Sequence, residues 1–152
     1  MVLRDLLRRE SVLVPLDAAD RGRAIAALVE VLALPGSGPE DRAAVRAAVL
    51  ARETAGSTGI GHGVAIPHAR APQVPATCMA AARTAAPVDF AAADGQRASL
   101  LFLLAIPAAE PRSYLPVLAA LSRLAGDQKL LRRLNKAADR DEFYDLISDF
   151  PL

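Results

Sequence analysis

A glycine-rich segment at residues 52–70 constrains this chain more than any other feature. The segment reads Arg-Glu-Thr-Ala-Gly-Ser-Thr-Gly-Ile-Gly-His-Gly-Val-Ala-Ile-Pro-His-Ala-Arg and contains both histidines of the chain, His62 and His68. Three alternating glycines precede a short apolar run at residues 64–66, and Pro67 separates that run from His68. Glycine allows close backbone approach, and proline is disfavoured inside a central strand. The pattern therefore predicts a turn and then a short strand over 64–66, with a histidine just beyond the strand.

The same segment carries the chemical groups that a phosphohistidine site requires. A neutral histidine has a lone pair on one ring nitrogen that can attack phosphorus, while the other nitrogen donates a hydrogen bond that fixes the tautomer. Backbone N–H groups of a glycine-rich turn can surround an anion, and an arginine can hold two phosphate oxygens. Here the candidate phosphate-stabilising groups are the side chains of Arg52, Arg70 and Thr58 and the backbone at Gly59 and Gly61.

The pattern from Arg52 to His68, with its Arg-Glu and Pro-His pairs, resembles the active-site signature of a bacterial protein family. These are the enzyme IIA proteins of the phosphoenolpyruvate:sugar phosphotransferase system, fructose/mannitol type (EIIA type-2), and the nitrogen-regulatory members are the most similar. The resemblance implies a three-layer α/β/α sandwich with a mixed central sheet, and we expect one domain over residues 1–152. It also implies that His68 accepts a phosphoryl group from the phosphocarrier HPr or its nitrogen-branch counterpart, that Arg52 stabilises the phosphate, and that no cofactor takes part.

Two positions depart from the family pattern. Many relatives have a second histidine at the start of the helix after the central strand, where this chain has Tyr114, and relatives commonly have Asn or an acidic residue where it has His62. The family fold would bring both side chains near His68. One hypothesis is that His62 supplies the polar contact of the missing histidine, while Tyr114 donates one neutral hydrogen bond. The alternative is that His62 is a permitted loop variant.

In the first third of the chain, apolar spacing and capping residues predict three helices and one strand. Val45, Ala48 and Val49 share one helical face, and we expect Glu53 to be a solvent-facing charge near the end of that helix. The predicted elements are a short helix over 1–10, a strand over 12–14 ended by Pro15, a helix capped by Asp20 and continuing to Leu32, and a helix from Pro39 to Arg52.

In the remainder, the alanine-rich residues 77–86 favour a helix by propensity, whereas the family pattern favours a strand, and we follow the family pattern. Residues 93–96 predict a turn, and the apolar run 100–106 is typical of a fully buried strand. Three helices are expected to close the chain, beginning near Ser113, after Asp127 and at Asp139.

Composition argues against several other classes of protein. The formal net charge of +1 predicts no strong attraction to nucleic acid or to a lipid surface, and no apolar run approaches the roughly 20 residues that span a bilayer. With no secretory leader pattern and a single cysteine, we expect a cytoplasmic protein. Two histidines six residues apart and one thiol are too few for a zinc site, and the glycine spacing does not match a dinucleotide-binding motif.

The leading hypothesis is a phosphotransferase with a phosphohistidine intermediate at His68 that acts in nitrogen-branch regulation. Its partners would be an HPr-like phosphocarrier and regulated target proteins, with no nucleic acid and no membrane insertion. The sequence contains no recognisable IIB or IIC segment, which favours regulation over transport. One alternative is a sugar-uptake IIA that passes phosphate to a separate fructose- or mannitol-type IIB. Another is a binding module that has lost phosphotransfer.

Overall fold

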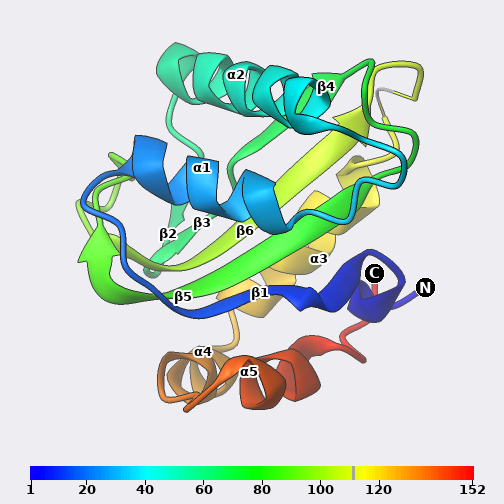
Figure 1. Ribbon diagram of the computed structural model, residues 1–152. Helices are drawn as coiled ribbons and strands as arrows, with labels where there is room; N and C mark the ends of the chain where they lie inside the picture. Colours follow the sequence, from blue (N-terminus) through cyan, green and yellow to red (C-terminus); the bar gives the residue numbers. More distant parts are fainter. Residues whose placement is uncertain (111) are drawn as a thin grey trace.

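A six-stranded mixed sheet lies at the centre of the protein (Figure 1). The computed structural model describes residues 1–110 and 112–152. Strand β6 pairs in parallel with β3 and, farther along, with β4, whereas β5 runs antiparallel to β6 and parallel to β1. In spatial order the strands are β1 (Leu7–Leu16), β5 (Cys78–Val88), β6 (Ala98–Pro107), β3 (Val64–Ala65) and β2 (Gly59–Gly61), with β4 (His68–Ala71) also on β6.

Helices cover both faces of this sheet. α1 (Arg21–Val31) and α2 (Pro39–Ala55) lie on one face. α3 (Leu115–Ala125), α4 (Gln128–Asn135) and α5 (Arg140–Ile147) lie on the other. A single 3-10 turn, η1 (Leu3–Asp5), precedes β1, and the two chain termini lie side by side because Val2 forms a bridge with Pro151. The three-layer α/β/α sandwich with a mixed sheet is confirmed.

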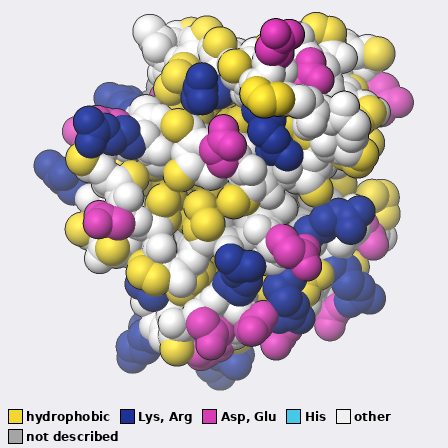
Figure 2. All heavy atoms as spheres, viewed as in Figure 1, with side chains coloured by type: hydrophobic (Ala, Val, Ile, Leu, Met, Phe, Trp, Pro, Cys, Tyr) yellow, Lys and Arg dark blue, Asp and Glu magenta, His cyan; other side chains and the backbone are white. Residues whose placement is uncertain are grey.

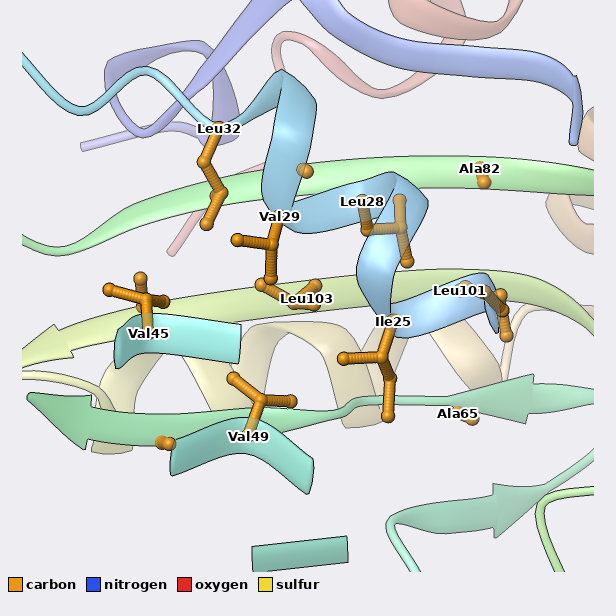
Figure 3. Packing of buried hydrophobic residues seen from close by; sticks show 14 of the residues in the cluster. Ile25, Leu28, Val29, Leu32, Val45, Val49, Ala65, Ala82, Leu101 and Leu103 are labelled. Atoms are coloured by element: carbon orange, nitrogen blue, oxygen red, sulfur yellow. The ribbon is translucent and has the colours of Figure 1, made fainter. Parts of the chain in front are cut away.

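The core between α1, α2 and the sheet holds α2 in place above β4. The apolar side chains of each helix recur at intervals of three and four residues, so they project from one face. They pack against small alanines of β5 and leucines of β6 on the facing side of the sheet (Figure 3). The helix residues are Ile25, Leu28, Val29, Val45 and Val49, joined by Leu32 directly after α1, and those of the sheet include Ala65, Ala82, Leu101 and Leu103. This packing fixes the C-terminal end of α2 next to β4.

Strand β6 is the buried centre of the molecule. Residues 100–106 are all buried, and successive side chains alternate between the α1–α2 core and the α3–α5 core. The predicted fully buried strand is confirmed. The alanine-rich segment is also a strand, β5, because it lies between β1 and β6, where small side chains fit beneath helices on both faces.

The first ten residues differ from the prediction. Only Leu3–Asp5 is helical, and strand β1 already begins at Leu7 and continues through Pro15 to Leu16. β1 lies at the edge of the sheet, where a proline without an N–H group is tolerated. Its exposed Arg8 and Glu10 are charges typical of an edge strand, and they hid the strand pattern in the sequence.

The predicted helix caps are confirmed. Asp20 Oδ1 accepts a hydrogen bond from the Arg23 N–H at 2.8 Å, and Asp127 and Asp139 make equivalent bonds at the starts of α4 and α5. The helix boundaries differ slightly, since α2 continues to Ala55 and α3 begins at Leu115.

The molecular surface is mixed in charge on the face that Figure 2 shows. Lys and Arg side chains there are interspersed with Asp and Glu side chains, and apolar atoms gather between them. Within residues 1–110 and 112–152, no helix has both the length and the apolar character needed to cross a bilayer.

Candidate functional site

His68 is the first residue of β4, and its ring is held in one orientation. The residue is half-buried, and its Nδ1 lies 2.7 Å from the carbonyl oxygen of Ile66. A carbonyl oxygen can only accept a hydrogen bond, so Nδ1 carries the hydrogen. In the neutral ring the lone pair is therefore on Nε2, the nitrogen that could act as a nucleophile.

Tyr114 covers His68 from the segment that leads into α3. The two ring centroids are 5.7 Å apart, and the ring planes are inclined by 25°, a stacked arrangement. The backbone of Tyr114 is fixed because its carbonyl oxygen accepts the N–H of Leu118 at 2.9 Å. The expectation that Tyr114 lies near His68 is confirmed.

The two rings border a cleft of about 260 Å³ between the end of α2, strand β4 and the start of α3. The charged residues of its lining are both arginines, Arg52 and Arg70, so the cleft suits an anion. Arg70 is two residues after His68 on the same strand, which places both side chains on one side of β4. Among the described residues, the lining consists of Ala48, Arg52, His68, Ala69, Arg70, Ile106 and Tyr114.

Arg52 reaches the cleft from the last turn of α2. Its Nη1 donates a hydrogen bond of 2.8 Å to the carbonyl oxygen of Gly56, one of the carbonyl groups exposed at the helix end. A guanidinium group has five N–H donors, so this bond leaves other donors for an anion in the cleft. The structure thus brings together His68, Arg52, Arg70 and Tyr114, as the sequence predicted.

The glycines serve a different purpose from the predicted phosphate cradle. β2 and β3 form a tight hairpin whose two turn residues, His62 and Gly63, have φ values of 59° and 76°. The Gly59 N–H donates to Ser57 Oγ at 3.0 Å, and a side chain at Gly59 would lie 2.9 Å from Ala92 Cβ. Gly59 and Gly61 therefore shape the hairpin and do not line the cleft.

His62 also lies away from His68, contrary to expectation. β3 pairs with β6 at Leu100, and β4 pairs with it at Leu104. Four residues of extended strand separate the two pairings by roughly 13 Å, and His62 lies at the far tip of the hairpin. The spacing along the chain could not reveal this, because it does not give the position of each strand along β6.

The hairpin tip is tied to a carboxylate from another loop. The His62 N–H donates to Asp94 Oδ2 at 3.0 Å, and the Gln96 N–H donates to Asp94 Oδ1 at 3.0 Å. The pKa of Asp94 is lowered, first by the bond from Gln96 and then by the bond from His62. The turn predicted at residues 93–96 is confirmed, and it anchors the hairpin.

Thr58 does not face the cleft, because Glu53 engages it. Glu53 Oε1 accepts the Thr58 N–H at 3.2 Å, and Glu53 Oε2 accepts the Thr58 hydroxyl. Glu53 is only 5% exposed, so its interpretation as a solvent-facing charge is wrong. The sequence contained the signal, since Glu53 follows Val45 and Val49 at intervals of four and shares their buried face.

A larger hollow of about 530 Å³ lies elsewhere, between the start of β1 and the start of β5. Its lining includes Cys78, where burial raises the thiol pKa to about 11, and Arg9, which donates to Asp141 and Asp145 at 2.9 Å each.

Across the described part of the chain, no three His, Cys, Asp or Glu side chains are grouped to hold a metal. We assign the functional site to the cleft because the histidine and two arginines meet there.

Comparison with known proteins gives consistent matches over nearly the whole chain. A family model described as phosphoenolpyruvate-dependent sugar phosphotransferase system, EIIA 2, matches residues 5–150. A nitrogen regulatory protein of Bradyrhizobium diazoefficiens is 33% identical over 148 residues, which cover 97% of this chain and 95% of that protein. The fructose-specific EIIABC component of Bacillus subtilis is 32% identical over 97% of this chain, but the match spans only 23% of that relative's length.

The fold leads to the same group of proteins. The crystal structure of nitrogen regulatory protein IIA-Ntr from Neisseria meningitidis superimposes with a TM-score of 0.78 at 29% identity, covering 94% of this chain and 97% of that one. The chain belongs to the EIIA 2 family of the phosphoenolpyruvate-dependent sugar phosphotransferase system, a family of phosphotransfer components that includes nitrogen regulatory proteins.

Proposed function

We propose that His68 accepts a phosphoryl group on Nε2 from an HPr-like phosphocarrier and that the phosphorylated protein acts in nitrogen-branch regulation. The main support is the 2.7 Å hydrogen bond between His68 Nδ1 and the Ile66 carbonyl oxygen. This bond selects the tautomer whose Nε2 is nucleophilic, in a cleft that also contains Arg52 and Arg70. One domain over residues 1–152 would carry the whole activity, consistent with a family match over residues 5–150.

The chemical step needs a positioned nucleophile and stabilised charge. The Nε2 lone pair forms a bond to phosphorus while the bond between phosphorus and the carrier breaks, and the carrier keeps that electron pair. In the loose transition state, negative charge is spread over the three equatorial oxygens. The guanidinium groups of Arg52 and Arg70 would stabilise these oxygens, and the Tyr114 hydroxyl, a neutral donor, would add one hydrogen bond.

The regulatory assignment is supported by relatives that are named nitrogen regulatory proteins and that match over nearly their whole length, as the Bradyrhizobium protein does. A sugar-uptake role is the second candidate. It is supported by the similar identity to the Bacillus fructose-specific EIIABC component. In that case the phosphoryl group would pass from His68 to a fructose- or mannitol-type IIB.

The proposal is tested by incubating the protein with phosphoenolpyruvate, enzyme I and the phosphocarrier, followed by intact mass measurement. We expect one added phosphoryl group on the parent protein and none on His68→Ala. His62→Asn is the matched control, since asparagine tolerates the left-handed backbone at this position. It should be phosphorylated at the parental rate. An unmodified parent protein would leave only the binding-module hypothesis, and labelling of His68→Ala would refute the assignment of the acceptor.

A second assay separates the two transfer roles. The phosphorylated protein is mixed with a fructose- or mannitol-type IIB, and phosphate transfer is followed by mass. Regulation predicts that the protein keeps its phosphoryl group in this mixture. Rapid transfer to IIB would instead support sugar uptake.

A further inference from the structure

Glu53 is a buried carboxylate that the phosphoryl-transfer step does not use. Its side chain is 4% exposed, and both of its oxygens have partners in Thr58, the N–H at 3.2 Å and the hydroxyl. Arg21 Nη1 of α1 lies 3.7 Å from Glu53 Oε1 and is itself more exposed to solvent. Burying a carboxylate is costly unless hydrogen bonds and a counter-charge compensate. An apolar residue at this position would avoid that cost, so the carboxylate needs an explanation.

The partners of Glu53 lead directly to the nucleophilic histidine. The carbonyl oxygen of Thr58 accepts the N–H of Ile66 at 3.0 Å. The carbonyl oxygen of Ile66 in turn accepts the hydrogen of His68 Nδ1 at 2.7 Å. Ile66 is thus held through both of its backbone polar groups, and the second of them sets the tautomer and orientation of His68.

The C-terminal end of α2 supplies both Arg52, which would bind the phosphoryl oxygens, and Glu53, which holds Thr58. Arg52 and Glu53 are adjacent in α2, and adjacent helical residues project about 100° apart. Arg52 therefore lines the cleft, while Glu53 points into the protein toward Thr58. Any movement of the segment 58–66 relative to α2 would change the position of His68 with respect to Arg52.

We infer that Glu53 is a positioning residue: through Thr58 and Ile66 it fixes the tautomer of His68 and the placement of the His68 ring opposite Arg52. The inference rests on the proposed function for its effect on rate. Its effect on the His68 tautomer does not depend on phosphorylation. The competing interpretation is that Glu53 only stabilises the fold.

Four variants test the inference. Glu53→Gln removes the charge at nearly constant shape, and Glu30→Gln makes the same change at an exposed position of α1 as a control. Thr58→Val removes the hydroxyl at constant shape, and Thr58→Ser keeps the hydroxyl. For each variant the nitrogen-15 NMR shifts of the unphosphorylated His68 ring report the tautomer, and the phosphorylation rate is measured at saturating carrier.

We expect Glu53→Gln and Thr58→Val to lose part of the Nδ1–H tautomer and to be phosphorylated about tenfold more slowly. Thr58→Ser should rescue both properties relative to Thr58→Val, and Glu30→Gln should match the parent. A lower melting temperature with unchanged tautomer and rate would overturn the inference and leave a structural role. If Glu53→Gln does not fold, the two Thr58 variants decide the question. If the parent takes no phosphate, the proposed function fails, while the tautomer comparison still tests the role of Glu53.

Discussion

The ring of Tyr114 stacks on the ring of His68, with 5.7 Å between the ring centroids. The stack limits the motion of the imidazole and covers one of its faces. A phenol brings a neutral donor to the cleft, whereas a histidine at this position could become a cation beside a phosphate dianion. Tyr114 therefore preserves the shape of the site, but it brings no positive charge, unlike the second histidine that many relatives have at this position.

Replacing Tyr114 by histidine should accelerate phosphorylation. The phosphoryl oxygens are charged, so a phenol already donates a charge-assisted hydrogen bond, and a protonated histidine adds its own positive charge to that bond. About 1.4 kcal/mol of extra attraction in the transition state would make Tyr114→His roughly tenfold faster. Tyr114→Phe is the control, because it keeps the ring and removes only the hydroxyl, and it should slow the reaction by about tenfold through the loss of one hydrogen bond to the charged phosphoryl oxygens. Single-turnover phosphorylation by the carrier measures both. A Tyr114→His variant that is no faster would show that charge at this position does not limit the rate.

Arg52→Gln should slow phosphorylation by about one to two powers of ten, because one charge-assisted hydrogen bond to the phosphoryl oxygens is lost. It should also reduce the free energy of unfolding by about 1 kcal/mol, since the bond from Arg52 to the Gly56 carbonyl oxygen is lost. Arg46→Gln, six residues earlier on α2 and outside the cleft, is the matched control for both effects. Equal rates for the two variants would mean that Arg52 only caps the helix.

Local patterns in the sequence were sufficient for much of the fold. The apolar run 100–106 could be recognised as β6, and the aspartate caps marked the starts of three helices, because these signals lie within a few residues. Residues 12–14 of β1 were predicted as a strand, but its start at Leu7 and its continuation through Pro15 were not, because edge position, not composition, makes Arg8, Glu10 and Pro15 acceptable there.

The site was predicted only in part for a related reason. The matched family pattern identified Arg52 and His68, and the fold places Arg70 and Tyr114 beside them. The position of His62 depends on where β3 and β4 pair along β6, which spacing in the sequence does not encode. The burial of Glu53, by contrast, could have been predicted from its helical face.

Cys78 should resist alkylation. Burial raises its pKa to about 11, so at pH 8 only about one thiol in a thousand is ionised, against roughly a quarter for a free cysteine. We expect iodoacetamide to modify Cys78 at least about a hundredfold more slowly in the folded protein than in guanidinium, with a rate that rises as the pH approaches 11. Since the folded state favours the thiol, its contribution to stability is complete below about pH 8.5 and is lost as the pH rises toward 11. Modification at the same rate in both states would contradict the burial of this thiol.

Asp94→Ala should weaken the β2–β3 hairpin without affecting the cleft. The pKa of Asp94 is lowered by the Gln96 and His62 N–H groups, so its stabilising effect is complete above the unfolded value of about 3.9 and is lost as the pH falls through the lower folded value. The melting temperature of the parent should therefore be higher than that of Asp94→Ala at neutral pH, and the difference between the two melting temperatures should shrink below about pH 4. Asp17→Ala, at an exposed position before α1, is the control and should show no such difference. Because the hairpin tip lies away from His68, Asp94→Ala should be phosphorylated at the parental rate. Slower phosphorylation of Asp94→Ala would show that the hairpin and the cleft are coupled. A difference in melting temperature that persists in acid would show that the stabilising effect of Asp94 does not depend on its charge.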